Sequence, residues 1–124
     1  MSTSSPPSLD PYVLAKLREE MGGDVDDLIE AFLVHLPGRV ALVASAAADG
    51  RADLLHQAAH KLKGVAATLG AGRLAWLADG IDREAREGRL PIEAAVLLRL
   101  DEEARCVERA FRAEAGRVSS TVGG

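Results

Sequence analysis

The chain has 124 residues, of which 48% are apolar and 27% are charged, and its formal net charge is −4. This length fits a single domain with one hydrophobic core, and the apolar share excludes a wholly disordered polymer. The negative charge argues against nucleic acid as the partner, because the phosphate backbone attracts basic surfaces, and the single cysteine, Cys106, can form neither an internal disulfide nor a thiolate metal site.

The chain opens with a polar segment and a short helix. Residues 1–8 are rich in serine, threonine and proline and lack the basic flank and apolar run of a signal peptide, so we expect a disordered tail. A helical domain is predicted over residues 9–116. Its first helix covers about 10–22, because Asp10 is a good N-cap and Pro11 suits the first helical position. A glycine pair then ends this helix.

A second, longer helix is predicted from Asp24 to about Asp49. Its apolar stripe keeps a helical period over about five turns. The stripe consists of Ile29, Phe32, Leu33, Leu36, Val40, Val43 and Ala47. Pro37 lies inside the stripe, and because the period is unbroken, we expect a kinked helix rather than two abutting helices.

Three more amphipathic helices follow, over about 51–69, over about 71–87, and from Pro91 to about Gly116. Residues 117–124 read as a flexible tail. No segment alternates like a strand, so the predicted fold is all-α: an antiparallel up-down four-helix bundle with a short additional N-terminal helix. No apolar stretch approaches the 18 or so residues of a membrane span, and we expect a cytoplasmic monomer that binds neither membrane nor nucleic acid.

The third predicted helix carries an outward-facing histidine. With about 100° per residue, its apolar side chains fall on an arc between roughly 120° and 260° from His60. This arc consists of Leu54, Leu55, Ala58, Ala59, Leu62, Val65, Ala66 and Leu69. His60 therefore points away from the core, and its neighbours on the exposed face are His56, Gln57, Lys63, Gly64 and Ala67.

Lys63 and Gly64 lie one turn beyond His60 on the same face. The lysine can reach an anion attached to the imidazole, acting as a point charge toward phosphate oxygens. A glycine within a helix costs about 1 kcal/mol relative to alanine, and one reason to keep it is clearance for a docking protein. An exposed histidine with a cation and an open flank fits a nucleophilic phosphoryl carrier. An ordinary surface histidine, a solvated lysine and a glycine used for helix packing are the alternative interpretations.

The same residues resemble the signature of the histidine-containing phosphotransfer (HPt) domain family. That signature reads H-x-L-K-G, then G-A, then x-x-L and an acidic or amide residue on the next helix. It is matched by His60-Lys61-Leu62-Lys63-Gly64, Leu69-Gly70-Ala71, Leu74, Leu77 and Ile81-Asp82. The resemblance covers about 80 residues, including the Leu36-Pro37 segment, since this family often has a proline there.

The resemblance implies that His60 accepts a phosphoryl group from a receiver domain or a sensor (hybrid) histidine kinase and passes it to an aspartate of another receiver. It implies that Lys63 helps to hold this group and that Gly64 gives the partner room. Asp82 stands where the family often has Glu or Gln, which can accept the Nδ1 proton of the histidine and leave Nε2 as the nucleophile. Asp82 departs from this pattern in having a shorter reach than Glu or Gln.

The resemblance also implies that the partner receiver supplies Mg²⁺. Because the His60 face carries no evident acidic metal cluster and the chain no Gly-rich nucleotide loop, we expect no cofactor bound by this chain. We therefore expect a phosphorelay intermediate without independent catalytic activity. The exposed residues near His60 that we expect to contact the partner are His56, Gln57 and Ala67.

Two other functions fit parts of the sequence. His56 and His60 have the i, i+4 spacing of the H-E-x-x-H zinc helix, although Gln57 replaces its glutamate and no third ligand is evident. Alternatively, the chain is an HPt-like interaction module that carries no phosphoryl group. The joint presence of His60, Lys63 and Gly64 argues against this module.

Overall fold

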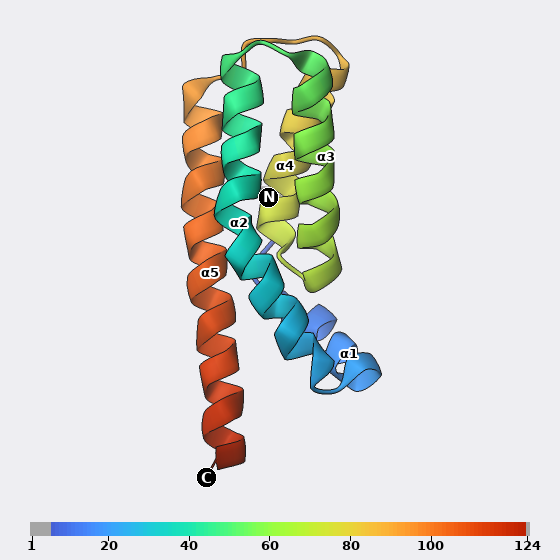
Figure 1. Ribbon diagram of the computed structural model, residues 1–124, viewed down its shortest axis with the longest axis vertical. Coiled ribbons are helices and arrows are strands. Elements are labelled where there is room, and N and C mark those ends of the chain that lie inside the picture. The colour runs from blue at the N-terminus through green and yellow to red at the C-terminus, as the bar shows by residue number, and fades with distance from the viewer. Residues whose placement is uncertain (1–5, 124) are drawn as a thin grey trace, which may run out of the picture.

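The structure is a computed structural model that describes residues 6–123, with side chains described as far as Glu114 (Figure 1). Within residues 6–123 the chain forms five helices and no strand. They are α1 (Pro11–Met21), α2 (Asp24–Ala48), α3 (Ala52–Leu69), α4 (Gly72–Arg86) and α5 (Ala94–Gly123).

Helices α2 to α5 form the antiparallel four-helix bundle that the sequence predicts. Each packs against two others in a closed ring, α2 on α3, α3 on α4, α4 on α5 and α5 on α2, and the α3–α4 contact is the most extensive. The short helix α1 contacts α2 and α3 at the end of the bundle where α2 begins (Figure 1). The predicted fold is confirmed.

Helix α1 is defined by its caps. The Asp10 side chain accepts a hydrogen bond from the Tyr12 N–H at 3.0 Å, Pro11 occupies the first turn, and Gly22 ends the helix at φ +63°. Residues 6–8 of the expected tail belong to the described part of the chain. The Pro7 carbonyl accepts from the Arg73 N–H at 2.9 Å, because the chain lies against the start of α4. The rest of the expected tail, residues 1–5, is outside the described residues.

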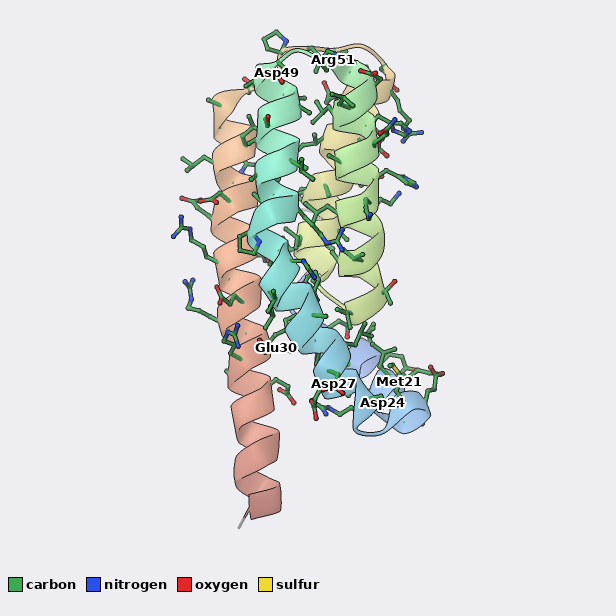
Figure 2. All side chains as sticks on the ribbon, in the orientation of Figure 1. Met21, Asp24, Asp27, Glu30, Asp49 and Arg51 are labelled. Atoms are coloured by element: carbon green, nitrogen blue, oxygen red, sulfur yellow. The ribbon has the colours of Figure 1, made fainter. Side chains whose placement is uncertain are left out.

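Helix α2 is one continuous helix with Pro37 inside it, and Figure 1 shows that it bends, as the apolar period predicts. Figure 2 shows Asp24 and Asp27 at its start, next to Met21 at the end of α1. Carboxylates there suit the positive end of the helix dipole.

The expectation that no apolar stretch approaches the length of a membrane span does not hold for α2. Among the described residues, α2 is long and apolar enough to cross a membrane, with a mean hydropathy of 1.5 over its best window. Its apolar face packs in the bundle core, from Val25 to Ala47. A core helix of a globular domain meets the same criterion, so this is weak evidence for a span.

Helix α5 differs from its predicted bounds at both ends. It begins at Ala94 rather than Pro91, which lies in the preceding loop. It continues to Gly123 instead of ending at Gly116, and the expected flexible tail from residue 117 is helical. An internal glycine costs only about 1 kcal/mol, and no proline follows it to stop the helix.

The core joins all five helices and supports the histidine face of α3. Below His60, the side chains of Leu55, Ala59, Leu62 and Ala66 are completely buried. Leu54 was predicted in the core but is 40% exposed, because it lies at the rim of a groove between α2 and α3 together with Leu42.

Truncating the core beneath His60 tests this packing. We expect Leu62→Ala to lower the free energy of unfolding by about 2–5 kcal/mol, through lost burial and a residual cavity. The matched control, Leu42→Ala, removes the same atoms from a side chain that is 63% exposed and changes stability by less than about 1 kcal/mol. Urea unfolding measures both, and equal losses would contradict this description of the core.

Candidate functional site

His60 lies in the middle of α3 and points into solvent. Its side chain is 66% exposed, while Ala59 and Leu62 on either side of it in the sequence are fully buried. The helical period therefore places the imidazole outward, as the sequence predicts, on a backbone that is fixed by the core.

Asp82 approaches His60 from α4, the neighbouring helix. Its side chain is only 2% exposed, and its Oδ2 lies 3.4 Å from Nδ1 of His60. The other oxygen of Asp82 makes a shorter contact with a different histidine: Oδ1 lies 2.5 Å from Nδ1 of His56. The centroids of the two histidine rings are 5.7 Å apart. One buried carboxylate thus faces two imidazoles, one turn apart on α3.

This arrangement has a chemical consequence for the rings. A carboxylate can only accept, so an imidazole Nδ1 facing it carries the proton. A neutral imidazole protonated at Nδ1 keeps its lone pair on Nε2, the nitrogen on the far side of the ring. Arg86 adds positive charge on the same carboxylate, with its Nε 3.7 Å from Oδ2.

Lys63 is paired in this structure. Its Nζ donates to Oδ1 of Asp79 at 2.9 Å, and the other oxygen of Asp79 lies 3.3 Å from Nε of Arg83. The hydrogen bond from Lys63 lowers the pKa of Asp79 below its ordinary value of 3.8, and the charges of Lys63, Arg83 and Arg86 act in the same direction. To bind an anion on His60, the Lys63 ammonium has to break its hydrogen bond to Asp79, or donate to Asp79 and to the anion at the same time.

The surface next to His60 is open. A Cβ built on Gly64 would meet nothing within 4 Å outside its own helix backbone, so this glycine is not required for helix packing. Gln57 and Ala67 are also exposed on α3. The structure therefore brings the predicted residues of α3 to one face and adds Asp82 from α4.

Two contacts at this site were not predicted from the sequence. His56 hydrogen bonds to Asp82, and Lys63 hydrogen bonds to Asp79. The signal was present in the spacing, since Asp79 and Asp82 are three residues apart and therefore share one face of α4. The register of α3 against α4 could not be predicted from this spacing, because it is set by the packing of the two helices.

The zinc interpretation requires a third ligand near His56 and His60. Among the side chains of residues 6–114, no group of three His, Cys, Asp or Glu is arranged to hold a metal ion.

Comparison with known proteins identifies the family. The Hpt domain model matches residues 13–114, which is more than half of the chain. The chain belongs to the Hpt domain family. It is thus a histidine phosphotransfer module of two-component signalling, the class of protein that acts with histidine kinases and receiver domains.

Solved structures agree with this assignment. Histidine-containing phosphotransfer protein B (HptB) from Pseudomonas aeruginosa PAO1 is 31% identical, with a TM-score of 0.83 over 90% of this chain and 96% of that chain. The HPT domain of an Hpt sensor hybrid histidine kinase from Shewanella is 20% identical, with a TM-score of 0.71 over 92% and 95%, and shows the shared fold. No curated protein matches the chain significantly.

The pairing of Lys63 with Asp79 predicts a pH effect. Because the pKa of Asp79 is lowered in the folded protein, the pair's contribution to stability is complete above the unfolded pKa, near 3.8, and is lost as the pH falls through the folded pKa. The contribution is about 1 kcal/mol or less, since both side chains are partly exposed.

NMR titration of the Asp79 carboxyl tests this pairing. In Lys63→Met the pKa should rise toward 3.8. Lys61→Met, the matched control on an exposed lysine of the same helix, should leave it low. A pKa that is unaffected by Lys63→Met would refute the pairing.

Proposed function

We propose that Nε2 of His60 accepts a phosphoryl group from the aspartyl phosphate of a receiver domain or from a histidine kinase, and passes it to an aspartate of another receiver domain. One observation carries the proposal: the imidazole is 66% exposed while its Nδ1 faces a buried carboxylate. This combination directs the lone pair to solvent, where a docked partner can present the phosphoryl group.

The transfer is a substitution at phosphorus. The Nε2 lone pair of His60 forms the P–N bond as the P–O bond to the partner's aspartate breaks, and that carboxylate leaves with the electron pair. The ring retains its Nδ1 proton and therefore becomes positively charged when the P–N bond forms. The carboxylate of Asp82 offsets this charge. Lys63 moves from Asp79 toward the phosphoryl oxygens and offsets their charge.

We assign part of the chemistry to the partner. Phosphoryl transfer depends mainly on positioning and on neutralisation of charge. We propose that Mg²⁺ in the receiver's acidic pocket neutralises the charge. We therefore infer a monomeric relay intermediate without catalytic activity of its own, acting in the cytoplasm with receiver domains and a hybrid sensor kinase. His56, Gln57 and Ala67 lie on the face of α3 where we place the docked partner.

Replacement of the acceptor tests the proposal. After incubation with a phosphorylated receiver, the wild-type chain should carry an acid-labile, base-stable phosphoryl group, and His60→Gln should carry none. The helical circular dichroism should be unchanged, since the side chain is outside the core. Label that persists in a folded His60→Gln would refute the assignment, and a wild-type chain that binds receivers without being labelled would favour the interaction module.

A second test concerns the open flank. Gly64→Gln should block transfer from the receiver because the longer side chain occupies the space left for the partner, while stability stays equal or rises by up to about 1 kcal/mol. Gly38→Gln is the matched control: Gly38 is an exposed glycine within α2 that also has open space at its Cβ position. Normal transfer by Gly64→Gln would contradict the clearance argument.

A further inference from the structure

A second histidine takes the best hydrogen bond of the site. Nδ1 of His56 lies 2.5 Å from Oδ1 of Asp82, whereas Nδ1 of His60 lies 3.4 Å from Oδ2. The His56 side chain is 42% exposed, less than that of His60. The residue nearer to the buried carboxylate is therefore not the proposed phosphoacceptor.

The carboxylate depends on His56 for its orientation. A carboxylate that is 98% removed from solvent needs hydrogen-bond donors. Among the described side chains, His56 makes the only hydrogen bond to the Asp82 carboxylate. Arg86 stays at 3.7 Å, and the contact with His60 is longer than a well-formed N–H···O bond.

The short side chain of Asp82 explains why such support is useful. Aspartate has one methylene fewer than glutamate, so from the α4 backbone its oxygens barely span the distance to His60. With Oδ1 fixed by His56, the remaining oxygen, Oδ2, is directed at Nδ1 of His60. Without this bond the carboxylate is free to rotate toward Arg86, which lies on its own helix one turn away.

We propose that His56 is a positioning residue for phosphoryl transfer. It donates its Nδ1–H to Oδ1 of Asp82 and thereby holds Oδ2 against Nδ1 of His60. This keeps His60 in the tautomer with the proton on Nδ1 and the nucleophilic lone pair on Nε2. The inference rests on the proposed function, but its structural part, the tautomer of His60, is independent of phosphorylation.

Two substitutions of His56 separate the donor from the shape of the side chain. His56→Met is similar in size and has no donor, whereas the amide of His56→Gln retains an N–H that can reach Asp82. The test measures the ring ¹⁵N shifts of His60 by long-range ¹H–¹⁵N NMR on the unphosphorylated full chain, and the transfer rate from a phosphorylated receiver. His35→Gln, on an exposed histidine of α2, is the control for the ring shifts and their assignment.

We expect the wild-type His60 to be protonated on Nδ1. In His56→Met this tautomer should lose population and transfer should slow by about tenfold or more, whereas His56→Gln should retain both properties in large part. His35→Gln should leave the His60 ring shifts at their wild-type values.

Three results would overturn the inference. The first is wild-type ring shifts that place the His60 proton on Nε2, which needs no variant. The second is a His56→Met protein with the wild-type tautomer and rate. The third is a folded His56→Gln protein as impaired as His56→Met. If the wild-type chain accepts no phosphoryl group at all, the proposed function fails, while the ring shifts still decide whether His56 orients His60.

Discussion

A carboxylate buried between two helices is the interaction on which the site depends. The Asp82 side chain is 2% exposed in the α3–α4 contact, yet its oxygens face two imidazoles that are themselves open to solvent. Burial strengthens its hydrogen bonds and prevents water from replacing them. The four-helix bundle contributes by holding α3 and α4 in the register that brings Asp82 opposite His56 and His60.

A second acidic residue sets the resting state of the site. Asp79 pairs with Lys63 one turn along α4, so the cation near His60 is already neutralised before any phosphoryl group arrives. In our account the two aspartates have different roles. Asp82 orients the nucleophile, and Asp79 binds Lys63 until a phosphoryl group is present.

Much of this was predictable from the sequence, and the failures have physical causes. Helical periodicity gave α1 to α4 and the outward direction of His60, since these follow from spacing along a single helix. The end of α5 was missed because Gly116 resembles a stop signal but lies within a helix that continues. The bond between His56 and Asp82 was missed because contacts between helices depend on their relative register, which spacing along one helix does not contain.

The position of the phosphoryl group tests the central claim most directly. After the wild-type chain is phosphorylated by a receiver, phosphopeptide mapping and NMR identify the modified histidine and its modified nitrogen. Our account predicts phosphoryl on Nε2 of His60, with His56 unmodified. Phosphoryl on Nδ1 of His60, or on His56, would show that Asp82 does not direct the chemistry as described.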